Sequence, residues 1–188
     1  MTLGLYALVT DVTAIRRNEA GLIRLARFDA LTGLPNRRQF DERLAEAMAR
    51  TRRLRQPIAL SFLDIDRLKT INDSLGHAAG DAVLTEFARR LVNTVRGTET
   101  VARLARDEFM IILDLAGPQA RHVAGKIALA VHADFLIEGH TRMVTSSIGV
   151  ALFERGAMTP GEWVARADAA LFSARDAGRN GYRVASAV

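Results

Sequence analysis

PIALSFLDID, residues 57–66, is the strongest indicator of the fold in this 188-residue chain. It is a mostly apolar run that opens at Pro57 and closes on two carboxylates, Asp64 and Asp66. Such a run is typical of a strand that is buried on both faces and ends at a polar site. We therefore expect a buried strand here that leads into a functional site.

The segments that follow this strand alternate between helical and strand patterns. They are a helix over 76–96, a strand hairpin around RLARDEF at 103–109, a helix over 118–133 and a strand in RMVTSSIGVALF at 142–153. The resulting order is β-α-β-β-α-β, which is typical of a ferredoxin-like antiparallel sheet flanked by helices. We therefore predict an α/β fold of the α+β type.

Two more helices are expected outside this unit. Breakers in LTGLPN, residues 31–36, precede a helix over 37–53, and Thr159 is placed to cap a helix over 160–177. Before residue 29 the sequence indicates a strand ending near Asp11 and then an amphipathic helix. A lone strand has no sheet to join, so we expect residues 1–28 to be the end of a preceding domain and a helical linker, and residues 29–188 to form the main domain.

Composition excludes several classes of function. The chain has 26 Lys and Arg against 21 Asp and Glu, which gives a net charge of +5. This charge is compatible with nucleotide partners but is not specific evidence for them, and it gives no reason to expect nucleic acid. The chain has no cysteine, which excludes disulfides, thiolate catalysis and a zinc ribbon and suits the cytoplasm. The four histidines lack metal-ligand spacing, and no apolar run reaches the roughly 18–20 residues that cross a bilayer.

The predicted order of elements makes the strand-end carboxylates informative. Asp64 ends the first strand and Asp107 lies in the hairpin, so the two can share one Mg²⁺ if the hairpin lies beside that strand. Hard divalent cations prefer carboxylate and carbonyl oxygens, and Mg²⁺ usually keeps waters and substrate phosphates as well. On the pattern alone the alternative, two hydrated aspartates without a metal, stays open.

Four blocks of the sequence resemble, in order and spacing, the signature blocks of the GGDEF domain of diguanylate cyclases. They are DALTGLPNRRQF (29–40), LDIDRLKTINDSLGHAAGD (63–81), ARLARDEF (102–109) and ADAALFSARDAGRNGY (167–182). The resemblance implies a nucleotidyl-cyclase-like fold and an activity that joins two GTP molecules, one on each domain of a facing homodimer, into cyclic di-GMP. The segment GLYALVTDVTAIRRNEAGLIRLA (4–26) resembles the end of a PAS sensor domain.

This resemblance also implies roles for the matching residues. Asp64, the backbone carbonyl of Ile65 and Asp107 would hold Mg²⁺ or Mn²⁺, while Glu108 would help to activate the attacking hydroxyl. The catalytic group would thus be Asp64, Asp107 and Glu108. The substrate-binding residues would be Asn72 and Asp81 for guanine, and Lys69, Arg175 and Arg179 for the triphosphate.

The chain departs from the family in the signature itself. Where the family has G-G-D-E-F, this chain reads Ala105, Arg106, Asp107, Glu108 and Phe109. Both glycines are replaced, and Arg106 puts a long side chain where phosphate and backbone nearly touch in the family. Either the turn is strained, or it is an altered phosphate loop whose Arg106 obstructs the phosphate or binds it.

A second departure concerns the product-binding inhibitory site of the family, which has the pattern R-x-x-D. Here the matching positions read R-G-T-E, from Arg96 to Glu99, which keeps the acid but adds a methylene. Two interpretations stay open: a remnant site that still binds cyclic di-GMP, or a solvated helix end.

Three functions are therefore weighed. The favoured one is a catalytically degenerate regulatory domain that binds GTP and Mg²⁺, because the metal and guanine residues are kept while both signature glycines are lost. The alternatives are a working diguanylate cyclase with an unorthodox loop and a dimerisation module without nucleotide. Family members often adjoin PAS sensor domains and phosphodiesterase domains of the EAL type, and we expect such neighbours here.

Overall fold

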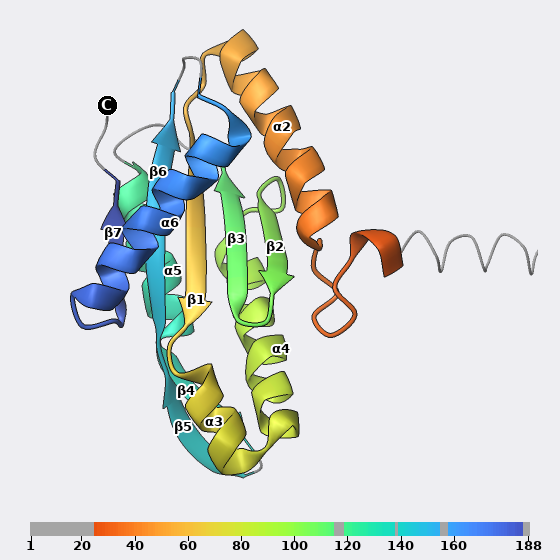
Figure 1. The fold of residues 1–188 in the computed structure, drawn as a ribbon, viewed down its shortest axis with the longest axis vertical. Coiled ribbons are helices and arrows are strands. Elements are labelled where there is room, and N and C mark those ends of the chain that lie inside the picture. Colours follow the sequence, from red (N-terminus) through yellow and green to blue (C-terminus); the bar gives the residue numbers. More distant parts are fainter. Residues whose placement is uncertain (1–24, 115–118, 138, 155–157, 186–188) are drawn as a thin grey trace, which may run out of the picture.

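The computed structural model describes residues 25–114, 119–137, 139–154 and 158–185. At its centre lies a five-stranded sheet with the strand order β2-β3-β1-β6-β7 (Figure 1). The strands are β1 (Ile58–Ile65), β2 (Thr100–Ala105), β3 (Glu108–Leu113), β6 (Ser146–Phe153) and β7 (Gly181–Val184). The predicted α/β class with a helix-flanked sheet is confirmed, and a single pair, β6 with β7, runs parallel among the described strands.

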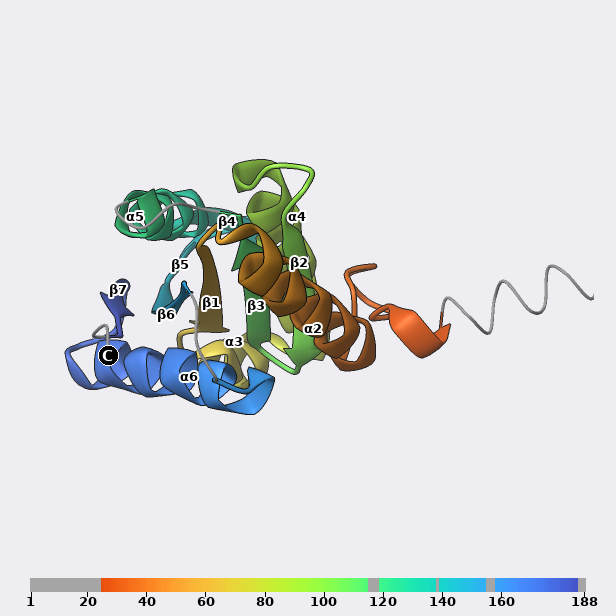
Figure 2. The same ribbon diagram turned by 90° about the horizontal axis from the view of Figure 1, so that it is seen from above.

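Helices cover both faces of this sheet. Figure 2 shows α2 and α6 on one side of the strands and α4 and α5 on the other. The helices are α2 (Arg37–Leu54), α3 (Leu68–Leu75), α4 (His77–Thr94), α5 (Gln119–Val131) and α6 (Pro160–Asp176). The predicted cap of α6 is present, since Thr159 forms a capping box with Glu162, and Asn36, which was expected only as a breaker, caps α2 by accepting from Gln39 N–H.

Strand β1 is buried along its whole length because alternate side chains enter two separate cores. On one face Ala59, Leu63 and Ile65 pack with Val83, Phe87, Leu91 and Ile127 of α4 and α5. On the other face Ile58, Leu60 and Phe62 pack with Phe40, Leu44, Trp163 and Leu171 of α2 and α6. The predicted buried strand at 57–66 is thus confirmed, and helices pack against both of its faces.

Helix α6 lies unusually close to the sheet. A Cβ on Gly149 of β6 would come within 2.0 Å of the Ala167 carbonyl oxygen, so only glycine fits there. The indole Nε1 of Trp163 donates a 3.0 Å hydrogen bond to the Ala151 carbonyl. These contacts fix the position of the helix whose last turn carries Arg175.

Three predictions about the elements need correction. The strand expected over 142–153 is broken at Thr145 into β5 (His140–Val144) and β6, and β5 pairs with β4 (Ala133–Ile137) in a separate ribbon. The break lies where the chain leaves the β1–β6 ladder: Asp66 N–H still donates to the Thr145 carbonyl at 2.9 Å in that register, and β5 then pairs with β4 instead of β1. The helix expected to reach residue 96 ends at Thr94, and α3 and β7 were not predicted.

Most of the segment expected to be a preceding domain and linker lies outside the described residues. Of this segment only residues 25–28 are described; Leu25–Arg27 are helical, and Phe28 bridges to Pro35. The following turn is organised by Asp29, whose carboxylate accepts from the N–H of Thr32 at 2.8 Å and from its hydroxyl at 2.6 Å. Over the described ranges, none of the helices has the length and apolar character of a membrane span.

Candidate functional site

Three connections meet at the end of β1 that carries Asp64: the β2–β3 turn, the start of α3 and the α6–β7 turn (Figure 1). Asp64 lies opposite Glu108 in the β1–β3 ladder. The N–H of Ile65 points to the carbonyl of Asp107 at 3.4 Å. The structure therefore brings together two pairs of neighbouring residues, Asp64 with Ile65 and Asp107 with Glu108, that lie more than 40 positions apart in the sequence.

Asp64 is the most perturbed carboxylate of this group. It is only 8 % exposed. Burial, and then repulsion from the carboxylate of Asp107, raises the pKa of Asp64 to about 6, and a hydrogen bond from Arg175 opposes that rise. Two acids that repel one another in a buried setting are stabilised by a shared cation.

The donors at this end suit a hard divalent cation. In the described part of the chain, no cluster of three or more His, Cys, Asp or Glu side chains is placed to hold a metal. Mg²⁺, however, commonly takes one or two carboxylates and completes its shell with water and substrate phosphates. Asp64 and Asp107, with the Ile65 carbonyl, fit that pattern, and the guanidinium of Arg175 on Asp64 shows that this carboxylate accepts a cationic partner.

The hairpin turn is formed by Arg106 and Asp107 between β2 and β3. Two-residue hairpin turns normally need positive φ, yet Ala105, Arg106 and Asp107 are absent from the positive-φ residues of the described chain. The ladder instead shifts register between Arg103 and Ala105, a β-bulge that puts one extra residue in β2. Of the two alternatives for this turn, a strained backbone therefore has no support from positive φ, and an altered phosphate loop with a substituted side chain at Arg106 stays a prediction.

Arg103 holds the turn in place. Its guanidinium is only 10 % exposed and donates to the Arg106 carbonyl at 2.6 and 3.0 Å and to the Asp29 carboxylate at 3.0 Å. Its backbone N–H donates to the Pro35 carbonyl at 3.0 Å. The signature hairpin is thus tied to the turn that precedes α2. Sequence reasoning missed Arg103 and Asp29, since a motif does not reveal which of its members touch.

The expected guanine-binding residues come together where α3 and α4 pack. Asn72 of α3 lies against Gly80 of α4, where an added Cβ would be 1.8 Å from the amide oxygen Oδ1. That oxygen is buried and has no hydrogen-bond partner within the described part of the chain. Asp81, next to Gly80, is exposed. Asn72 and Asp81 thus bring an amide and a carboxylate to the contact between α3 and α4, and both groups can accept from N–H donors of a ligand.

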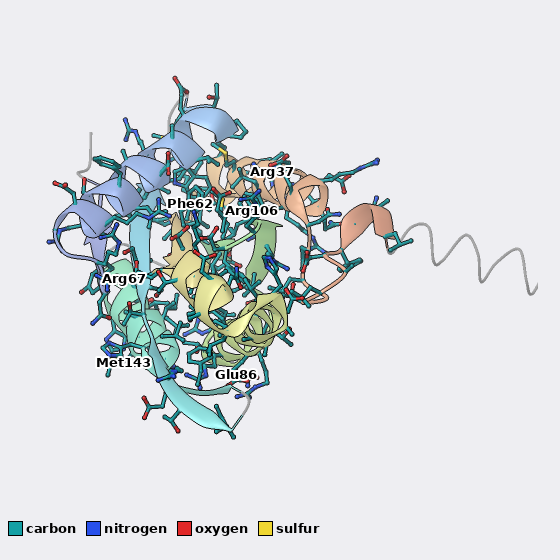
Figure 3. All side chains as sticks on the ribbon, turned by 60° about the horizontal axis from the view of Figure 1, so that its bottom comes forward. Arg37, Phe62, Arg67, Glu86, Arg106 and Met143 are labelled. Carbon is teal, nitrogen blue, oxygen red and sulfur yellow. The ribbon has the colours of Figure 1, made fainter. Side chains whose placement is uncertain are left out.

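Basic side chains surround the acidic pair. Lys69 is exposed in the first turn of α3, and Arg179 is exposed in the α6–β7 turn. Arg175, expected at the triphosphate, instead pairs with the carboxylate of Asp64. Figure 3 looks toward this end and labels Arg106, which is exposed, and Arg67, a basic residue with a φ of 58° that the motif analysis did not single out.

Asp66 is a second residue that sequence reasoning did not assign. Its carboxylate is 7 % exposed. It accepts from the hydroxyls of Thr145 and Ser147, both at 2.7 Å, and from the N–H of Asn180 at 3.1 Å. The only signal in the sequence is a second aspartate two positions after Asp64, and that spacing does not disclose the distant partners.

The inhibitory-site remnant lies elsewhere, at the start of β2 rather than at its turn. Arg96 and Glu99 close a small loop: the Arg96 N–H donates to the Glu99 carboxylate at 2.6 Å, and the Glu99 N–H donates to the Arg96 carbonyl at 2.9 Å. A cavity of about 560 Å³ opens beside them, with Arg27 and Arg43 also in its lining. Arg96 and Glu99 therefore line a pocket that also contains Arg27 and Arg43 and is separate from the end of the sheet that carries Asp64.

Comparison with known proteins agrees with this geometry. The family model described as "Diguanylate cyclase, GGDEF domain" matches residues 26–181. The chain is 39 % identical over 171 residues to the bifunctional diguanylate cyclase/cyclic di-GMP phosphodiesterase MucR of Pseudomonas aeruginosa, covering 90 % of this chain and 25 % of MucR. It thus spans about a quarter of that relative.

Solved structures give the same result. The GGDEF domain of TpbB (YfiN) from Pseudomonas aeruginosa has a TM-score of 0.81 and 39 % identity, over 85 % of this chain and 94 % of that one. The coiled coil and GGDEF domain of DgcB from Caulobacter crescentus, solved with cyclic di-GMP, has a TM-score of 0.84 and 29 % identity, over 94 % of each chain. With the family model matched along most of its length, this chain belongs to the GGDEF domain family of diguanylate cyclases.

Proposed function

We propose that this GGDEF domain binds GTP with Mg²⁺ or Mn²⁺ and has weak or no cyclase activity, so that its role in cyclic di-GMP signalling is regulatory. The observation that carries the proposal is the meeting of Asp64 and Asp107 at one end of the sheet, where burial and mutual repulsion favour a cation. Both acidic residues of the signature are kept, while both of its glycines are replaced.

The binding half of the proposal assigns each group a task. The metal would neutralise phosphate charge at Asp64, Asp107 and the Ile65 carbonyl. Asn72 and Asp81 would bind the guanine edge, because an amide oxygen and a carboxylate accept from its N–H groups. Lys69, Arg175 and Arg179 would hold the phosphates, which requires Arg175 to exchange its contact with Asp64 for one with the nucleotide.

The proposed loss of cyclase activity depends on Arg106. The turn accommodates arginine without a positive φ, so the obstacle is the bulk of the side chain at a phosphate-facing position rather than backbone strain. In-line attack demands close alignment, and a misplacement of about 1 Å can lower a rate on the order of a hundredfold. We therefore expect bound GTP to be held away from the attacking geometry.

A working cyclase is the second candidate, and one observation favours it. Asp107 and Glu108 are kept in a hairpin without positive φ at residues 105–107, and Arg103 donates to the carbonyl of Arg106 in its turn. In this alternative Arg106 turns outward and binds a phosphate of its own or the opposing nucleotide. A module without nucleotide is less well supported, since Asn72 and Asp81, the residues expected at guanine, are kept together with the acidic residues of the signature.

Regulation and partners follow from the same proposal. Catalysis would need a homodimer, because each domain holds one GTP. The cavity beside Arg96 and Glu99 would accept cyclic di-GMP as a regulatory ligand, with its arginines facing the product phosphates. The domain would adjoin a sensor domain of the PAS type and a phosphodiesterase domain of the EAL type. A domain of low activity would then pass a signal from the sensor to the phosphodiesterase.

Nucleotide binding and product formation test the proposal together. The purified domain is titrated with GTP and ATP in the presence of Mg²⁺, and cyclic di-GMP is then quantified. Preferential GTP binding with little product supports the proposal. Turnover like that of an active cyclase supports the second candidate, and equal or no binding of both nucleotides contradicts the assignment. Asp107→Asn should weaken Mg²⁺-dependent binding, whereas Asp168→Asn, on the exposed side of α6, is the matched control.

A further inference from the structure

Asp66 connects three parts of the chain that meet at the phosphate end of the site. Its Oδ2 accepts from the Thr145 hydroxyl and from the backbone N–H of Asn180, and its Oδ1 accepts from the Ser147 hydroxyl. The donors belong to the β5–β6 junction, to β6 and to the α6–β7 turn. A carboxylate that is 7 % exposed with three donors is held in a single orientation.

The α6–β7 turn adopts a backbone conformation that needs outside support. Gly178, Arg179 and Asn180 have φ values of 111°, 64° and 48° in succession. Glycine adopts positive φ freely and asparagine tolerates it, but arginine rarely does. Such a conformation persists only where the surroundings enforce it.

Two backbone hydrogen bonds support the turn from the helix side. They run from Gly178 N–H to the Arg175 carbonyl at 3.2 Å and from Arg179 N–H to the Ala174 carbonyl at 3.1 Å. Asp66 holds the turn from the sheet side through the N–H of Asn180, which belongs to the peptide unit that follows Arg179. The orientation of that peptide determines where the Arg179 side chain leaves the backbone.

We infer that Asp66 is a positioning residue: its carboxylate holds the α6–β7 turn in the left-handed conformation that presents Arg179 to the nucleotide phosphates. Thr145 and Ser147 orient the carboxylate toward Asn180. The inference rests on the proposed function for the task of Arg179, but the link from Asp66 to the turn stands independently of any nucleotide.

The link is tested first without nucleotide. Amide hydrogen exchange at Asn180, followed by NMR, is compared among the unmodified chain, Asp66→Ala and the control Asp168→Ala. We expect exchange at Asn180 to become about tenfold faster or more in Asp66→Ala, because its carboxylate acceptor is gone. Unchanged exchange would overturn the inference whatever GTP does.

The consequence for binding is tested with GTP and GMP. Asp66→Ala should weaken GTP by about tenfold while GMP, which lacks the two outer phosphates, changes little. Arg179→Ala should do the same, and the double variant should bind GTP no more weakly than Arg179→Ala alone. A general structural role would instead weaken both nucleotides, and additive losses in the double variant would show that Asp66 does not act through Arg179.

Two further results keep these outcomes separable. If the unmodified chain binds no GTP, the proposed function is wrong. The hydrogen-exchange experiment then remains the test of the link from Asp66 to the α6–β7 turn. If Asp66→Ala does not fold, Asp66→Asn replaces it, since the amide has nearly the same shape but one carbonyl oxygen and no charge. We then expect smaller changes in the same direction, and no change in either measurement would overturn the inference.

Discussion

At the scale of single residues, the contact between Asn72 and Gly80 means that any side chain at position 80 must displace the end of the Asn72 side chain. A Cβ at Gly80 would lie 1.8 Å from the Asn72 amide oxygen, far inside any real contact distance. If Asn72 binds the guanine base as proposed, Gly80 supports that binding without touching the base.

Gly80→Ala is expected to remove most of the preference for GTP over ATP. The new methyl group displaces the end of the Asn72 side chain, and a lost or misplaced hydrogen bond to the base costs about 1–2 kcal/mol, or roughly tenfold in affinity. The measurement is the ratio of the two dissociation constants. Gly125→Ala in α5 is the control, because its nearest added contact, with Tyr182, is an ordinary 3.8 Å. A preference retained in Gly80→Ala would contradict the assignment of Asn72.

At the scale of elements, the signature hairpin is positioned by a segment far away in sequence. Arg103 in β2 binds Asp29 in the turn before α2 and, with the same guanidinium, the carbonyl of Arg106. A second contact, from Arg37 to Glu108 at 3.7 Å, is more exposed. The turn before α2 and the loop that carries Asp107 are therefore joined through one side chain, Arg103.

Arg103→Met is expected to destabilise the domain by about 2 kcal/mol and to loosen the hairpin, because it removes the guanidinium that donates to the Arg106 carbonyl and to Asp29, which keeps only its donors from Thr32. Urea unfolding measures the first effect, and amide exchange in β2 and β3 measures the second. Arg37→Met removes an exposed ion pair and should have a much smaller effect on both. Equal effects of the two substitutions would show that Arg103 has no special role.

The docking of α4 onto β4 is expected to depend on pH. Hydrogen bonds from Arg89, and then from Arg90, lower the pKa of Glu86 from the ordinary 4.5 to about 2. Arg90 also stacks on Phe135 at 4.0 Å and donates to the Asp134 carbonyl at 2.8 Å. Because the folded pKa lies below the unfolded one, the stabilisation is complete above about pH 4.5 and is lost as the pH falls toward 2.

Glu86→Gln should therefore flatten the fall in stability between pH 5 and 2.5, by at most about 1 kcal/mol since the group is partly solvated. Urea midpoints across this range give the measurement. Glu46→Gln, on the exposed side of α2, serves as control. The same slope in Glu86→Gln as in the unmodified chain would rule out a contribution from Glu86.

At the scale of the whole molecule, the sequence allowed the central strand, both covering layers and the acidic end of the site to be predicted. The run at 57–66 is long and mostly apolar, which is typical of a strand buried on both faces, and β1 is such a strand. Thr145 shows the limit: the residues around it have uniform strand character, and the pattern does not disclose that β5 pairs with β4 instead of β1. Likewise, the substituted signature left a strained turn and an altered phosphate loop as alternatives, and only the structure shows the bulge beside Ala105.

The central claim is that the domain binds GTP but turns it over poorly because of Arg106. The most direct test measures cyclic di-GMP formed from GTP and Mg²⁺ by the unmodified domain and by the double variant Ala105→Gly, Arg106→Gly, each fused to a dimeric coiled coil. With both proteins saturated by GTP, we expect little product from the unmodified domain and on the order of a hundredfold more from the variant. Equal turnover by the two proteins, or a variant that binds GTP and dimerises yet forms no product, would contradict the claim.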